Sequence, residues 1–126
     1  MKNKKAVTDL PLMLLVEGHH NKVPFFITKD MFYGVPFELA GGDISGLVDK
    51  PVADTHKHEV DEIYFLISPL PGEAVIDVTI NMETTTYSSP AVIHVPAGHE
   101  HKFITRRAGK GSYCFGILYK KDEVAV

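Results

Sequence analysis

Short apolar runs and alternating apolar–polar runs, separated by turn residues, follow one another along the 126 residues of the chain. The clearest alternation is AVIDVTI at residues 74–80, and a period of two is typical of a strand that buries one face. Similar runs predict strands at 91–95, 102–105 and 112–119, and residues 84–87 are rich in threonine, which favours β structure. The pattern predicts an all-β fold of about eight to ten strands with little helix.

The longest expected strand covers residues 56–68. Residues 12–17 are ambiguous, because so short a run fits either a strand or a short helix. Many short antiparallel strands must close on themselves or form two packed sheets, and a small barrel leaves room for one small ligand. We expect a single domain over residues 1–126. Further strands are expected at 25–28, 31–33, 35–39 and, weakly, 44–48, with a turn at 41–43.

Composition narrows the class of protein. Hydrophobic residues make up 44% and charged residues 23% of the chain, which is typical of a soluble globular domain. The net charge of −3 offers no general attraction for nucleic acid or an anionic membrane, and no apolar run is long enough to span a bilayer. The single cysteine, Cys114, excludes an intramolecular disulfide, is expected to be a small buried hydrophobe, and favours a reducing, cytoplasmic location.

The strongest chemical signal is a group of histidines and carboxylates. His56 and His58 are one residue apart, so both imidazoles lie on the same face of a strand. Glu62 falls on that face if the strand continues, whereas Asp61 has the opposite parity. His101 comes from a distant part of the chain, just after a Pro-x-Gly turn. Three imidazoles and one carboxylate, from His56, His58, Glu62 and His101, predict a site for a divalent metal.

Other histidines are candidates for proton transfer. His94 lies on a strand that leads toward the expected cavity, so it is our candidate catalytic residue, as a general base or as a hydrogen-bond donor to a metal ligand. The alternative is an ordinary, partly exposed histidine. His19, His20 and His99 occur in loop or turn segments and are expected at the surface.

Aromatic residues are expected around the pocket. Tyr64 shares the parity of Glu62, and Phe103 shares that of His101, so both should point inward. We expect Phe115 to close the same wall. Aromatic residues on the inner face of a barrel are also ordinary core, so pocket and core interpretations both stand here.

The spacing of these residues resembles that of the cupin superfamily. Its first motif runs Gly, five residues, His-x-His, three or four residues, Glu, six residues, Gly; its second runs Gly, five residues, Pro-x-Gly, two residues, His, three residues, Asn. The chain matches at His56, His58 and Glu62, and again at Pro96, Gly98 and His101. The resemblance covers residues 50–105, and the chain departs from it at four turn or supporting positions, Lys50, Pro69, Pro90 and Thr105.

The resemblance implies a jelly-roll β-barrel that binds one divalent transition metal (Fe, Mn, Ni or Zn) through His56, His58, Glu62 and His101. It implies a mononuclear metal-dependent enzyme acting on a small organic molecule, with a dioxygenase placed ahead of an isomerase or decarboxylase. A non-catalytic module that binds a small molecule is the alternative. The resemblance also implies a homodimer, with residues 74–80 and the Phe-rich N-terminal segment as candidate surfaces. No nucleic-acid or membrane partner is expected.

Overall fold

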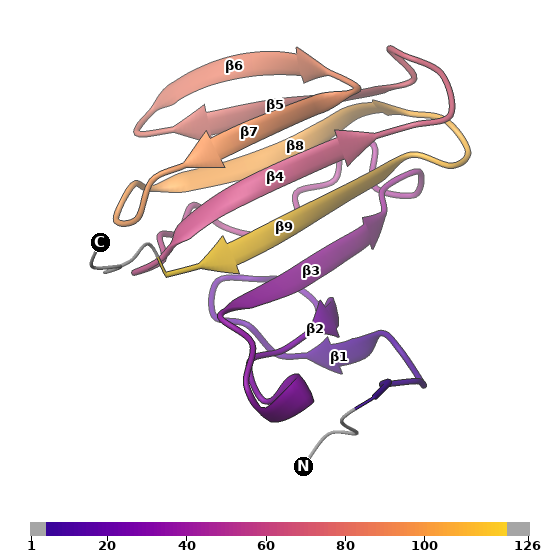
Figure 1. Cartoon of the computed structure of the whole chain (residues 1–126). Coiled ribbons are helices and arrows are strands. Elements are labelled where there is room, and N and C mark those ends of the chain that lie inside the picture. Colours follow the sequence, from indigo (N-terminus) through magenta and orange to yellow (C-terminus); the bar gives the residue numbers. More distant parts are fainter. Residues whose placement is uncertain (1–4, 121–126) are drawn as a thin grey trace.

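A computed structural model describes residues 5–120, and these form two antiparallel sheets that face each other (Figure 1). The larger sheet has the order β1-β2-β3-β9-β4-β7, and the smaller has the order β6-β5-β8. The strands are β1 (Leu12–Leu14), β2 (Val23–Ile27), β3 (Phe37–Asp43), β4 (Asp61–Ile67), β5 (Ala74–Ile80), β6 (Glu83–Ser88), β7 (Ala91–Val95), β8 (His101–Ala108) and β9 (Tyr113–Tyr119). The all-β fold predicted from the sequence is confirmed.

The core lies between the two sheets. In β5 the alternating residues Ile76 and Val78 are almost completely buried, as the period of two predicts. Tyr64 and Leu66 of β4 meet them from the larger sheet, together with Ile93 of β7. Full burial of one such aliphatic side chain stabilises the fold by about 1.5–3 kcal/mol. This packing fixes which residues of β4 face inward.

Helix is nearly absent from residues 5–120. The segment expected as a strand at 31–33 is instead a 3-10 helix, η1 (Met31–Tyr33), in which Phe32 and Tyr33 have positive φ. A positive φ is incompatible with a strand, so the apolar character of this segment serves local packing of Met31 instead. No helix in the described part of the chain is long and apolar enough to cross a membrane.

Two further segments near the pocket differ from the sequence prediction. Residues 41–43 continue β3 and do not form a turn, because Gly41 has φ 119° and lies directly against β9. A Cβ at position 41 would be 2.3 Å from the carbonyl oxygen of Cys114, so only glycine allows the two strands this approach. Residues 44–48 form a turn with a single bridge from Val48 to Thr105.

Candidate metal centre and pocket

Three histidines from two distant segments meet at one end of the space between the sheets. The side chains of His56, His58 and His101 each offer a nitrogen, and these nitrogens lie within 4.8 Å of one another. His56 and His101 are held together by a backbone bridge, in which each N–H donates to the other residue's carbonyl at 3.1 and 2.7 Å. The three side chains therefore form a group that can hold a metal ion.

Backbone hydrogen bonds orient two of the rings. Nδ1 of His56 donates to the carbonyl of Asp54 at 2.7 Å, and Nδ1 of His101 donates to the carbonyl of His99 at 3.0 Å. Since a carbonyl only accepts, the proton of each neutral ring is on Nδ1. The lone pair is therefore on Nε2, where a metal ligand needs it.

Glu62 brings a buried carboxylate to the same group. Its Oε1 lies 3.0 Å from Nε2 of His101 and 3.5 Å from Nε2 of His58. Burial is the largest influence on the pKa of His101 and lowers it, but the hydrogen bond to Glu62 and the other favourable contacts outweigh burial and raise this pKa overall. Burial lowers the pKa of His58, which keeps that ring neutral at neutral pH. A cation that displaced the proton shared by His101 and Glu62 would meet imidazole nitrogens beside a carboxylate, which is a suitable ligand set for a transition metal.

The route by which these residues converge differs from the sequence prediction. The expected strand at residues 56–68 begins only at Asp61, because the chain bends at residues 59–60. His56 is instead held by its bridge to β8, and the carbonyl of His58 accepts from the backbone N–H of Gly98 at 2.8 Å. Strand parity alone therefore does not explain why the histidines and Glu62 share one face.

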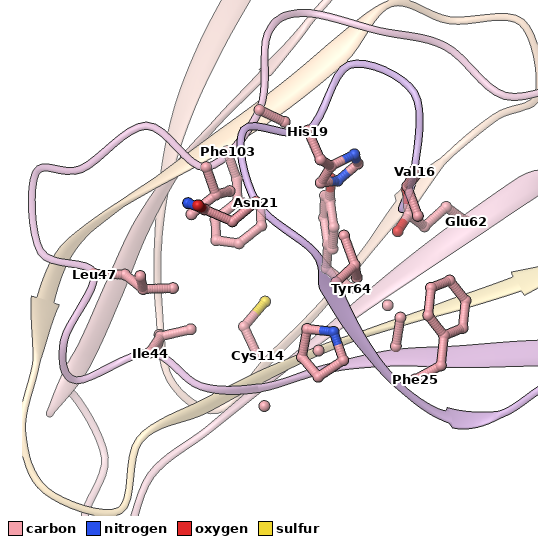
Figure 2. Close-up of a pocket in the computed structure, with 18 of the residues that line it drawn as sticks. Val16, His19, Asn21, Phe25, Ile44, Leu47, Glu62, Tyr64, Phe103 and Cys114 are labelled. Carbon is pink, nitrogen blue, oxygen red and sulfur yellow. The ribbon is translucent and has the colours of Figure 1, made fainter. Parts of the chain in front are cut away.

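A cavity of about 300 Å³ opens beside this group, with His56, His58 and Glu62 in its wall. Tyr64 and Phe103 line it, and in the view of Figure 2 Tyr64 stands between Glu62 on one side and Phe103 and Leu47 on the other. Away from the histidines the wall is largely apolar, with Phe25, Ile44, Leu47, Cys114 and Leu118. Burial raises the pKa of the Cys114 thiol to about 12, so this residue is a protonated, apolar part of the wall.

Two residues expected at the pocket lie outside it. Phe115 alternates with the inward residues Cys114 and Gly116 of β9, so it points to the outer face, where it contacts Phe26 and Tyr113. His94 likewise alternates with the buried Ile93 and Val95 of β7. The structure corrects the expectation for Phe115, and for His94 it favours the alternative interpretation, a partly exposed histidine, over the catalytic one.

The outward-facing His94 belongs to a hydrogen-bonded pair. Its Nε2 lies 2.7 Å from Oδ2 of Asp61, and its side chain is 46% exposed. The second oxygen of Asp61 accepts from the backbone N–H of Ala97 at 3.1 Å. The pair therefore supports the turn before His101 from outside the barrel, where it cannot exchange a proton with a molecule in the cavity.

His19 is a pocket residue that sequence reasoning missed. It was expected at the surface, but its half-buried ring lines the cavity, and its centroid is 5.0 Å from that of His56. Burial lowers its pKa, so the ring is mainly neutral at neutral pH. The segment from Gly18 to His20 is tied to residues 52–54 by backbone hydrogen bonds. This long-range pairing left no pattern in the sequence.

Comparison with known proteins gives a partial match in sequence. No family model matches the chain. An uncharacterized protein of Streptomyces coelicolor is 44% identical over 57 residues, which are 44% of this chain and 50% of that protein. The chain thus spans about half the length of the curated relative that it matches.

Solved structures match far more of the chain. A Cupin 2 conserved barrel domain protein from Salinispora arenicola has a TM-score of 0.59 at 13% identity, over 93% of this chain and 92% of that one. A cupin protein from Bacteroides fragilis has a TM-score of 0.57 at 15% identity, over 95% and 92%. KdgF from a Halomonas species has a TM-score of 0.51 at 12% identity, over 81% and 80%. The two facing sheets, the pocket between them and these neighbours together identify the fold of this chain as that of the cupins, a jelly-roll β-barrel.

Proposed function

We propose that the protein is a mononuclear metal-dependent cupin enzyme that acts on a small organic molecule. The observation that carries this proposal is the position of His56, His58 and His101 beside a cavity of about 300 Å³. The nitrogens and the nearby Glu62 carboxylate suit Fe, Mn, Ni or Zn. A ligand set of four leaves coordination positions open on an octahedral ion, as a catalytic site requires.

The side chains of the pocket have distinct roles in this proposal. The chemistry that a bound transition metal supplies here is Lewis-acid polarisation of a substrate oxygen, or dioxygen chemistry when the metal is iron. Glu62 supplies a negative charge that offsets the charge of the cation. Phe25 and Phe103 keep water away from the bound molecule, which strengthens electrostatic interactions inside the pocket. An oxygenase-type reaction is placed ahead of isomerisation or decarboxylation by analogy with the cupin superfamily, since the histidine–carboxylate set by itself suits Fe, Mn, Ni and Zn alike.

Metal content tests this function directly. Protein purified without added metal should carry about one transition metal ion per chain by elemental analysis, and His58→Ala or His101→Ala should reduce this to below about 0.1. Lys57→Ala is the matched control, because Lys57 lies between His56 and His58 but is exposed and is not among the proposed ligands, so its loss should leave the metal content unchanged. Melting temperatures of the variants would show that the fold persists.

The outcomes separate the two functions considered. A wild-type chain that neither retains nor takes up Fe, Mn, Ni or Zn would contradict the enzyme proposal. If that metal-free chain still bound a small molecule in the cavity, the non-catalytic binding module would be the better function. If removal of His58 unfolded the chain together with loss of metal, the ion would be structural.

We further propose that the protein forms a homodimer through the outer face of the larger sheet. Phe65 and Val92, 40% and 64% exposed, lie side by side on this face, and Ile63 and Phe115 flank them. The carboxylate on the outer positions of β4, β7 and β9 is that of Asp61, and it is hydrogen-bonded to His94. Two copies of this face can therefore approach without repulsion between unpaired like charges. The expected surface on residues 74–80 is less suitable, because its outward Asp77 and Thr79 bond to side chains of neighbouring strands.

The buried thiol of Cys114 is consistent with the cytoplasmic location expected from the sequence.

A further inference from the structure

Tyr64 is a largely buried residue whose hydroxyl has no hydrogen-bond partner among the described residues. Tyr64 is only 4% exposed, and its ring packs edge-on against Phe103 at 5.2 Å and His101 at 6.2 Å. No described residue forms a hydrogen bond with its hydroxyl. Buried tyrosine hydroxyls usually find a hydrogen-bond partner, so this one requires an explanation.

The cavity accounts for the lack of a partner. The fully enclosed hydroxyls without a partner among residues 5–120 are those of Thr105 and Ser112. Tyr64 is not one of them, although it lines the cavity, so its oxygen reaches the cavity space. A tyrosine hydroxyl can donate a hydrogen bond, and this one faces the cavity. An acceptor on a molecule bound in the cavity can therefore reach this donor.

The rest of the cavity wall limits what the ligand can be. The residues opposite the histidines, including Ile44, Leu47 and Phe103, offer apolar surface and no hydrogen bonds from their side chains (Figure 2). Asn21, Lys22 and Asp43, which also line the cavity, are exposed. A molecule with many hydroxyl groups would lose its hydrogen bonds to water at the apolar wall without regaining them, which disfavours sugars.

We propose that the pocket binds a compact molecule with two ends: an oxygen-bearing head group that accepts the hydrogen bond of Tyr64 beside the histidines, and an apolar aromatic or branched body against Leu47 and Phe103. This inference rests on the proposed function, because it places the head group at the metal-binding side chains. It assigns Tyr64 as a residue that positions the ligand.

The test uses 4-nitrocatechol, an aromatic ring with two adjacent oxygens, and zinc-loaded protein, because zinc introduces no redox reaction. Absorbance titration should show that Tyr64→Phe weakens binding about tenfold, as expected for loss of one hydrogen bond to an anionic oxygen. Tyr113→Phe, which removes a hydroxyl from the outer face, should bind like the wild type. Zinc content should stay at one ion per chain in both variants.

A second measurement uses the wild type alone and does not depend on the variant folding. The zinc-loaded protein should bind 4-nitrocatechol at least about tenfold more tightly than D-glucuronate, a sugar acid without an apolar body. Equal affinity of Tyr64→Phe and wild type, no affinity of the zinc-loaded wild type for 4-nitrocatechol, or a preference for D-glucuronate would each overturn the inference. Failure to retain zinc would instead contradict the proposed function.

Discussion

At the scale of single residues, Gly116 decides whether Glu62 can lie beside the histidines. A Cβ at position 116 would be 2.4 Å from Oε2 of Glu62, so the carboxylate occupies the space that any other residue would fill. Gly116 itself is buried on the inner face of β9, directly opposite Tyr64 of β4. The absence of a side chain at this position is therefore part of the candidate metal centre.

We expect Gly116→Ala to displace the Glu62 carboxylate and weaken metal binding about 10- to 100-fold while the fold persists. Competition with a chelator of known affinity would measure this effect. Gly46→Ala is the matched control, because no atom lies within 4 Å of a Cβ built at that position. Unchanged metal affinity in Gly116→Ala would show that Glu62 does not ligate the ion.

Sequence reasoning at this scale worked where neighbours on one strand decided the geometry. Glu62 was preferred to Asp61 by parity, and within β4 the two do point to opposite faces, toward His101 and His94 respectively. Phe115 was placed wrongly, and of the two interpretations of His94 the partly exposed histidine holds, because which face of a strand is buried depends on the register of its neighbours. Neither sequence segment contained that information.

At the scale of elements, the loop that carries His19 is attached to the segment before His56 by an ion pair. Nε2 of His20 lies 3.0 Å from Oδ1 of Asp54, and the backbone of His20 donates to Val52. The hydrogen bond to Asp54 is the main reason that the pKa of His20 is raised, and the pKa of Asp54 is correspondingly lowered. The pair is exposed, so its contribution is screened by solvent.

The sign of the pH effect follows from these shifts. Because the folded-state pKa of His20 is raised, the attachment is fully present below the ordinary value of 6.5 and is lost as the pH rises through the raised value. Titration of the His20 ring by NMR should give a higher pKa in the wild type than in Asp54→Asn. Identical titration curves would show that the pair does not form in solution.

The elements themselves were predicted unevenly. The strand at residues 74–80 was predicted with its observed bounds, since its alternation reflects one buried and one outward face. Residues 56–60 were predicted as the start of the long strand at 56–68, but the chain bends at residues 59–60 and this segment pairs through a single bridge, from His56 to His101. Such irregular pairing is set by the partner segment, and the partner of His56 is His101, more than 40 residues further along the chain.

At the scale of the whole molecule, the exposed apolar residues Phe65 and Val92 on the outer face of the larger sheet predict that the protein is a homodimer. In Figure 1, β4 and β9 lie in front of β8, with their outer faces away from it. Light scattering should give about twice the chain mass of 14.0 kDa, as expected for a homodimer. Phe65→Lys should shift the protein toward the monomer, because a cation would have to be buried against a second apolar face.

Met82→Lys is the matched control for that substitution. Met82 is 91% exposed and lies in the turn between β5 and β6, away from the outer face of the larger sheet. Its replacement should leave the mass unchanged. A wild type that is monomeric at micromolar concentration would contradict the proposed interface.

The sequence alone determined the all-β class, the positions of most strands and the identity of the four candidate ligands, because alternation and the spacing of His56, His58 and Glu62 are local properties of the chain. Tertiary structure alone decided that His19 joins the pocket, that His94 and Phe115 face outward, and that Gly116 makes room for Glu62. The physical reason is that strand register and loop attachment arise from contacts between distant segments, and a one-residue change in register would reverse every side chain of a strand.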